Sequence, residues 1–146
     1  MNEKEAGPPM RISIALLGLL LTLTACASQP ATTSSANRVA ITLTDSGLKA
    51  EPATAPAGPV TFVVTNAGSV VHSFTVLKTT LAQDKVPADP ADPSRVQEGG
   101  KVGTTGQVPA VQTKELTLDL KSGGYVLLCN EPGHYLVGMH AAFTAK

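Results

Sequence analysis

The sequence has no excess of charge of either sign and no apolar run long enough to cross a membrane. Its 146 residues include 11 basic and 11 acidic side chains, so the formal net charge is zero at pH 7. There is no basic stripe, and the few aromatic residues do not alternate with Lys or Arg, which argues against nucleic-acid binding. The apolar run ISIALLGLLLTL at residues 12–23 falls short of the roughly 20 residues of a membrane-spanning helix.

That apolar run is instead typical of a secretory signal. Arg11 precedes it, and Leu23–Cys26, "LTAC", resembles the lipobox of bacterial lipoproteins, in which the chain is cleaved before the cysteine and the cysteine is lipidated. The alternative is an ordinary signal peptide cut nearby. The acidic leader "MNEKEAGPP" does not suit a signal, so Met10 is a candidate start, which N-terminal sequencing of the precursor would test. The lipobox predicts an extracytoplasmic protein anchored by lipid on Cys26 to a bacterial membrane, in the periplasm or on the cell surface.

Cysteine is scarce, and its scarcity is informative. The chain has two cysteines, Cys26 and Cys129, which an extracytoplasmic compartment would allow to form a disulfide. If Cys26 carries lipid, Cys129 is left alone in an oxidising compartment. A free thiol in such a compartment is a liability unless a bonding partner occupies it.

The remaining chain is divided into a tether and one domain. Residues 26–37 are polar and rich in Ser, Thr and Ala, which is typical of a flexible tether after a signal at residues 1–25. Residues 38–146 form the domain. Its short apolar segments alternate with turn residues and show no sustained helical period, which predicts an antiparallel β-sandwich of about seven or eight strands. The clearest segments are residues 39–44, 58–66, 70–78, 114–121, 124–130 and 140–146.

One long segment interrupts this pattern. Thr79–Val108 contains several prolines and glycines, mixed charges and no aromatic residue, which predicts a loop. A loop of this length in a small domain is functional, mobile or hides a short helix. The stretch "TLAQDK" at residues 80–85 is compatible with one helical turn.

In two of the predicted strands, the alternation of side chains predicts that possible metal ligands point into the core. In "VVHSFTVL", His72 lies on the same face as Phe74, and in "YVLLC", Cys129 is in phase with Leu127. A buried imidazole needs a partner, because leaving it unsatisfied costs about 1–3 kcal/mol. That partner is either a backbone or side-chain group or, since other soft ligands are near, a metal ion.

The stretch "CNEPGHYLVGM" supplies those further ligands. Cys129 ends a strand, Pro132–Gly133 reverses the chain, and His134 and Met139 return to the same region. A cysteine thiolate, two histidine nitrogens and a weak axial methionine sulfur are the ligand set of a blue-copper electron-transfer site. His72 supplies the second histidine from a neighbouring strand.

At these motifs the chain resembles the cupredoxins, the small blue-copper proteins, over residues 38–146. "NAGSVVHSF" at residues 66–74 carries His72, and "CNEPGHYLVGM" carries the other ligands. The spacing of four residues between Cys, His and Met is similar to that of rusticyanin and the sulfocyanins. The resemblance implies a Greek-key sandwich that binds one type 1 copper ion at one end, with His134 near the surface. The expected metal ligands are His72, Cys129, His134 and Met139.

The resemblance also implies roles around the ligands. We expect a partner-facing apolar patch, although ordinary core packing also explains Tyr135, Leu136 and Val137. The patch residues are Pro132, Tyr135, Leu136 and Val137. Asn66 and Ser73 are candidates for hydrogen bonds that hold the loop near the cysteine sulfur, and Asn66 is alternatively a turn residue only.

Two other polar residues near the ligands have simpler interpretations. His140 follows Met139 on a strand and should therefore point away from the metal. Glu131 is expected to be a solvated loop residue rather than a proton carrier.

The same residue counts restrict the function. Catalytic sites with several copper ions need several further histidines, and after His72 and His134 the chain has only His140. A binuclear copper centre needs two cysteines in the ligand loop, and this loop has one. Zinc usually prefers a closed tetrahedral site to a thioether ligand. We therefore predict a non-enzymatic, monomeric carrier of single electrons between transient redox partners outside the cytoplasm. The alternative is a copper-binding module for storage or delivery.

Overall fold

Residues 37–146 are described by the computed structural model, and the alternation of side chains explains their first strand. In β1 (Arg38–Thr44) the side chains of Val39, Ile41 and Leu43 are at most 1% exposed, whereas the residues between them face solvent. The predicted signal peptide, lipobox, start at Met10 and nearly all of the tether lie outside the described residues. No helix in this part of the chain has the length and apolar character of a membrane span.

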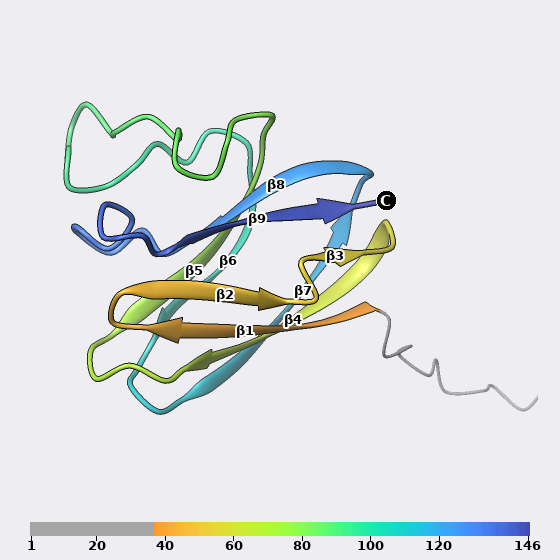
Figure 1. Cartoon of the computed structure of the whole chain (residues 1–146), viewed down its shortest axis with the longest axis horizontal. Coiled ribbons are helices and arrows are strands. Elements are labelled where there is room, and N and C mark those ends of the chain that lie inside the picture. Colours follow the sequence, from red (N-terminus) through yellow and green to blue (C-terminus); the bar gives the residue numbers. More distant parts are fainter. Residues whose placement is uncertain (1–36) are drawn as a thin grey trace, which may run out of the picture. The chain divides into compact units, whose positions relative to one another are not determined.

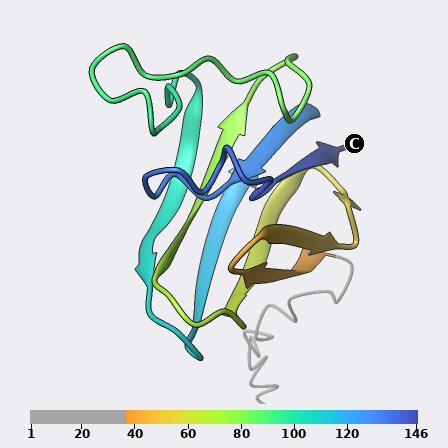
Figure 2. The same ribbon diagram turned by 60° about the vertical axis from the view of Figure 1, so that its left-hand side comes forward.

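In residues 37–146, nine strands form two sheets (Figures 1 and 2). In spatial order, the first sheet contains β2 (Gly47–Glu51), β1, β4 (Gly58–Asn66) and β7 (Thr113–Leu120). The second contains β3 (Thr54–Ala55), β9 (His140–Ala145), β8 (Gly123–Leu128), β5 (His72–Lys78) and β6 (Lys101–Val108). β1 pairs in parallel with β4, and β3 with β9, whereas the other pairs are antiparallel.

The predicted all-β sandwich is confirmed, but residues 37–146 contain nine strands instead of seven or eight, and two of the strand pairs are parallel. Three of these strands were missed. β2 and β3 are short and largely exposed, so neither shows a clear apolar alternation. β6, "KVGTTGQV", lies at the edge of its sheet and contains two glycines and two threonines. The predicted loop at residues 79–108 therefore ends at Gly100. Within it "TLAQDK" forms a turn, closed by the Lys85 amide and the Ala82 carbonyl at 2.9 Å, and no helix.

The main core lies between the sheets and reaches the predicted ligands. Phe62 packs against Phe74 and Phe143, with ring centroids 5.3 and 5.4 Å apart. Truncating such a buried ring to alanine costs about 3–5 kcal/mol. Cys129 and Met139 belong to the same cluster of buried side chains, so the packing that holds the sheets together also holds these two residues.

A second, smaller core lies on the opposite face of the second sheet. Residues 79–100 leave the end of β5 and return at the edge strand β6 (Figure 2). Side chains of this connection pack on β5 and β8, which explains why every residue of β5 before Lys78 is buried. The cluster consists of Leu77, Val86, Val96, Val126, Leu128 and Tyr135.

Candidate metal centre

Three of the predicted ligands converge at one end of the sandwich. His72 begins β5, Cys129 follows β8, and His134 lies in the turn after it. The Nδ1 atoms of the two histidines are 3.0 Å apart, and the cysteine Sγ lies 4.0 Å from that of His72 and 3.4 Å from that of His134. His72 and Cys129 are fully buried, whereas His134 is partly exposed.

The dimensions of this triangle suit a metal ion. A point in the plane of the three atoms lies about 2 Å from each of them, close to the length of metal–imidazole and metal–thiolate bonds. Two nitrogen donors and one sulfur donor, all within one such sphere, favour a borderline or soft transition metal over calcium or magnesium. The residues present therefore fit a trigonal metal site.

The ligand loop, residues 129–139, is closed by its own backbone. The Cys129 amide donates to the Met139 carbonyl at 3.0 Å, and the Met139 amide donates to the His134 carbonyl at 3.2 Å. Gly133 and Gly138 have φ values of 81° and 101°, which residues other than glycine rarely adopt. Met139, the predicted fourth ligand, is fully buried in the core cluster that contains Cys129.

Ser73 contacts the cysteine sulfur directly. Its amide donates to Sγ of Cys129 at 3.2 Å, and its hydroxyl oxygen lies 3.7 Å from the same sulfur. The hydroxyl also accepts a hydrogen bond from the Asn130 amide at 3.2 Å. Ser73 thus joins β5 to the start of the ligand loop and places a donor where negative charge on a thiolate is stabilised.

Asn66 acts on the neighbouring loop instead. Its amide nitrogen donates to the carbonyls of Val70 and Val108 at 2.8 and 2.9 Å, and its oxygen accepts from the Gly68 amide at 2.9 Å. These bonds close the connection between β4 and β5 and tie it to the end of β6. In residues 37–146 none of the hydrogen bonds of Asn66 reaches the cysteine, so its turn-forming role is the one observed.

Comparisons with known proteins support the same architecture. No family model and no curated protein matches the chain. Reduced auracyanin from the photosynthetic bacterium Roseiflexus castenholzii aligns at 20% identity over 75% of this chain and 97% of its own, with a TM-score of 0.60. Rusticyanin from Thiobacillus ferrooxidans aligns at 18% identity over 77% and 79%, with a TM-score of 0.57. Auracyanin B aligns at 19% identity over 75% and 88%, with a TM-score of 0.56.

Auracyanins and rusticyanin are cupredoxins. The described part of the chain has the cupredoxin fold. At these identities the likeness establishes the fold, and the site must be argued from its own residues. Within this cupredoxin fold, several contacts around the ligands were not anticipated from the sequence.

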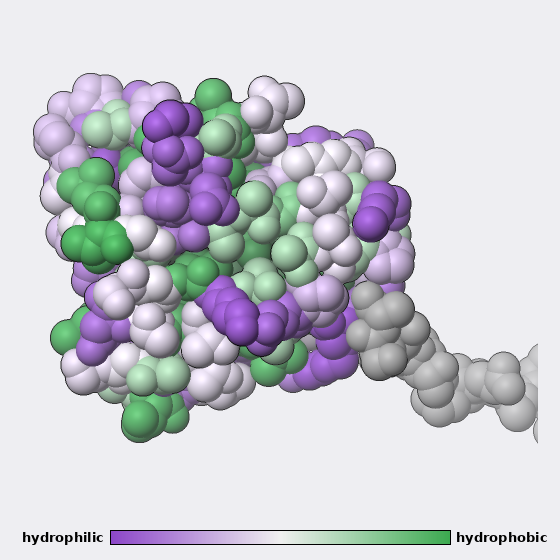
Figure 3. Space-filling model, in the orientation of Figure 1, coloured by the Kyte–Doolittle hydropathy of each residue, from purple (hydrophilic) through white to green (hydrophobic). Residues whose placement is uncertain are grey.

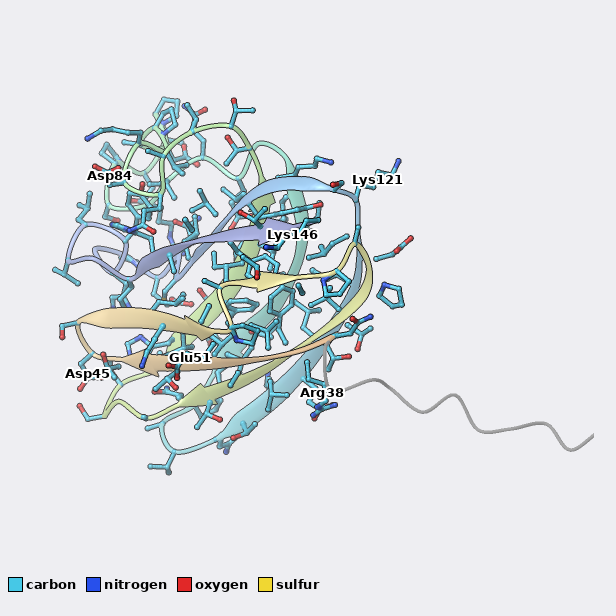
Figure 4. The ribbon with its side chains drawn as sticks, turned by 45° about the vertical axis from the view of Figure 1, so that its right-hand side comes forward. Arg38, Asp45, Glu51, Asp84, Lys121 and Lys146 are labelled. Carbon is cyan, nitrogen blue, oxygen red and sulfur yellow. The ribbon has the colours of Figure 1, made fainter. Side chains whose placement is uncertain are left out.

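Asp45 is the most consequential residue that the sequence analysis missed. It lies in the turn between β1 and β2, at the same end of the fold as the ligand loop (Figure 4). Its Oδ1 is 3.2 Å from Nε2 of His72, and its carboxylate accepts hydrogen bonds from the amide and hydroxyl of Ser69 at 2.8 and 2.7 Å. The bonds from Ser69, followed by those from His72 and Val70, lower the pKa of Asp45 to about 2. In the sequence Asp45 was indistinguishable from an ordinary turn residue.

The ring of His134 is held less closely. In the part of the chain that the structure describes, its partners are both at Nδ1, namely His72 and Cys129. Partial burial, followed by the repulsion that a protonated His72 would exert, lowers the pKa of His134, and Glu131 and Asp45 oppose this shift. Its unprotonated form, which binds metals, is therefore favoured.

Residues 79–100 hold the ligand loop from outside (Figure 1). The side chain of Asn130 accepts from the Val96 amide at 2.9 Å and donates to the Val96 carbonyl at 3.0 Å. The Gly133 amide donates to the Ser94 carbonyl at 2.7 Å, and the Arg95 guanidinium donates to the Asn130 carbonyl. The connection is thus bonded to the first half of the ligand loop.

Tyr135 also attaches the ligand loop to residues 79–100, so the prediction that it belongs to an exposed patch is wrong. It is 5% exposed, donates its hydroxyl to the Gln83 carbonyl at 2.7 Å and accepts from the Val86 amide at 3.0 Å. Leu136 and Val137 are 66% and 59% exposed, and Pro132 is exposed as well.

Apolar surface remains at this end of the fold. Figure 3 shows hydrophobic side chains over the ligand loop, at the left of the view. Val70 and Val71 precede His72 and are also exposed, and the sequence analysis did not assign them a surface role. The apolar residues around the site thus come from two loops.

The two remaining polar residues differ in outcome. His140 is outside the ligand cluster, and its ring packs 4.8 Å from that of Tyr135. Glu131 is not solvated as expected, because its side chain is only 14% exposed and lies 3.9 Å from the Arg95 guanidinium.

Proposed function

We propose that this protein is a mononuclear type 1 copper protein that carries single electrons between redox partners outside the cytoplasm. The observation that carries the proposal is the triangle formed by His72, Cys129 and His134, whose centre lies about 2 Å from each donor atom. Met139 is proposed as a fourth residue that would hold the ion, as a weak sulfur donor. A thiolate, two imidazoles and a thioether form the donor set of blue-copper sites.

Copper bound here would supply one-electron redox chemistry. The protein supplies a fixed set of donors: Cys129 is restrained by the Ser73 amide, and its backbone is bonded to Met139. Because the ligands come from a strand, a strand end and a hydrogen-bonded loop, little rearrangement is expected when the charge of the site changes. Such rigidity favours electron transfer and requires no substrate pocket, so we expect no catalytic turnover.

His134 is the proposed point of electron entry and exit. Of the three clustered donors it alone is not fully buried. Leu136 and Val137 follow it on the surface, and an apolar face of this kind suits brief contact with a redox protein. We propose that these residues, together with Pro132, form the partner-facing patch.

The attachment proposed for this carrier depends on Cys26. Lipid on that cysteine would anchor the chain to a bacterial membrane, and residues 26–37 would act as a tether. Labelling with a radioactive fatty acid tests this, because Cys26→Ser should abolish incorporation. Incorporation that persists in the variant would contradict an anchor at Cys26.

The site is tested by adding one equivalent of Cu(II) to the chain from Ala27 onward, with its thiol reduced. This chain retains the nine strands that the structure describes in residues 37–146. An intense thiolate-to-copper band with narrow copper hyperfine splitting in electron paramagnetic resonance is expected. Cys129→Ser is the control and should remove the band. Met139→Leu should leave a coloured site of higher potential because a weak donor is lost. A folded, Cu(II)-bound protein that stays pale would favour storage or delivery over electron transfer.

A further inference from the structure

Two imidazole nitrogens that face each other cannot both be protonated donors. The Nδ1 atoms of His72 and His134 are 3.0 Å apart, so in the metal-free protein one donates a hydrogen bond and the other accepts it. A neutral histidine carries its proton on one ring nitrogen only. The choice at His72 is therefore decided by whatever contacts its other nitrogen.

Asp45 makes that contact. Its Oδ1 lies 3.2 Å from Nε2 of His72, whose side chain is fully buried. A carboxylate is an acceptor only, so a neutral His72 carries its proton on Nε2 and leaves Nδ1 free. His134 then carries its proton on Nδ1 in the metal-free protein.

The carboxylate itself is held firmly in place. Ser69 donates to both oxygens of Asp45, through its amide at 2.8 and 3.1 Å and through its hydroxyl at 2.7 Å. Gly68 leaves the space that this approach requires. A Cβ at residue 68 would lie 2.1 Å from Oδ1 of Asp45 and 2.8 Å from Nε2 of His72.

We propose that Asp45 is a positioning residue that locks His72 in the Nε2-protonated tautomer, with Nδ1 free to bind the metal, and that its charge strengthens His72 as a donor. The statement about the tautomer stands without the metal. The statement about donor strength rests on the proposed copper function. Outer hydrogen-bond partners of this type orient metal-binding histidines and raise their basicity.

The first experiment measures the ¹⁵N shifts of the histidine rings in the metal-free chain from Ala27 onward. We expect His72 to be a single Nε2–H tautomer and His134 to be protonated at Nδ1. In Asp45→Ala, His72 should become a mixture of tautomers, while Asp84→Ala, which removes an exposed carboxylate paired with Lys85, should retain the wild-type pattern. A wild-type His72 protonated at Nδ1, or an unchanged pattern in Asp45→Ala, would overturn the proposal.

Gly68→Ala provides a second route if Asp45→Ala fails to fold. It keeps both side chains and separates them, because the added methyl group occupies their point of contact. We expect it to mix the tautomers of His72 as Asp45→Ala does. A single Nε2–H tautomer in Gly68→Ala would contradict the requirement for this contact.

The second experiment isolates charge from geometry. Asp45→Asn keeps an oxygen acceptor for His72 and loses the negative charge. We expect a higher reduction potential for the copper protein and an almost unchanged spectrum, whereas Asp45→Ala should also weaken Cu(I) binding about 10- to 100-fold in competition with a chelator. Asp84→Asn, an exposed carboxylate paired with Lys85, is the control and should leave the potential unchanged.

The two experiments separate this inference from the proposed function. An unchanged potential in Asp45→Asn would refute the role of the charge. A wild-type protein with the single tautomer and no blue site would contradict the proposed function while supporting the positioning of His72.

Discussion

His72 and His134 lie on opposite sides of the same site, and they differ in burial and in the contacts that position them. His72 is fully buried, and both of its ring nitrogens have partners. His134 is partly exposed and is positioned through its backbone and its loop. One histidine is built into the scaffold, and the other is presented to the surface by a loop that must be held from outside.

The supports behind the two histidines also differ. On the His72 side a single surface carboxylate, Asp45, joins two turns to the ring. On the His134 side the support is mostly buried, because Asn130 and Tyr135 bond to backbone groups of residues 79–100. We infer that the His72 side adjusts the electronic properties of the site and the His134 side maintains its shape.

Removing each ring in turn gives the largest expected effect. His72→Gly and His134→Gly should both abolish the blue copper site. Imidazole added to solution should restore colour to His134→Gly, because that position opens to solvent, and should fail with His72→Gly, because that position is enclosed. Visible spectra with and without imidazole measure the difference. Equal recovery of the two variants would contradict the assignment of buried and accessible sides.

Weakening the outer support should cost stability. Asn130→Ala leaves the amide and carbonyl of Val96 without their side-chain partner, which costs about 1–3 kcal/mol. Urea unfolding of the metal-free protein measures the loss, and broader copper resonance lines should accompany it in the loaded protein. Gln97→Ala is the matched control, since its side chain makes a single exposed hydrogen bond to the Ala88 carbonyl. Equal stability of the two variants would mean that the connection does not hold the loop.

The exposed face should affect rate rather than stability. Leu136→Ser changes a side chain that is 66% exposed, so the free energy of unfolding should change by no more than about 0.5 kcal/mol. Electron self-exchange between two copies, followed by NMR line broadening, should nevertheless slow. Val102→Ser, which alters a 40% exposed residue at the start of β6, at the end of that strand far from His72, should leave the rate unchanged. Equal slowing by both substitutions would mean that the contact face does not lie around His134.

Acid should produce the smallest change. Because burial lowers the pKa of His134 in the folded state, protonation favours the unfolded chain. This group's contribution to the stability of the metal-free protein is therefore complete above the ordinary histidine pKa of about 6.5 and decreases as the pH falls through that region. Thermal unfolding between pH 8 and pH 5 should show this decrease, and His134→Gln should show less of it. An identical pH profile in the variant would assign the decrease to other groups.

Much of the fold could be read locally. Strands with a clear apolar alternation, such as β1 and β4, were found from their own residues, because alternation directly reflects one buried face. β6 was missed because an edge strand rich in glycine and threonine has no such pattern. The inward direction of His72 and Cys129 was also correctly predicted from strand phase.

The surroundings of the ligands could not be read in the same way. In the sequence Tyr135 lies between His134, which is partly exposed, and Leu136, which is exposed. Its burial depends on Gln83 and Val86, about 50 residues earlier in the chain. Glu131 likewise faces Arg95 instead of solvent. Both depend on where residues 79–100 lie, and nothing in that segment's composition specified its position.

The sequence by itself determined three clustered donors, His72, Cys129 and His134, and the strand segments that lead to them, because ligand chemistry and side-chain alternation are local properties. Apart from Ser73, only the tertiary structure decided which groups surround those donors. Asp45 is 27 residues from His72, and Asn130 is 34 residues from Val96, so their contacts arise from the packing of loops at one end of the sandwich. Such contacts have no period and no motif, because they are set by the folded path of the chain.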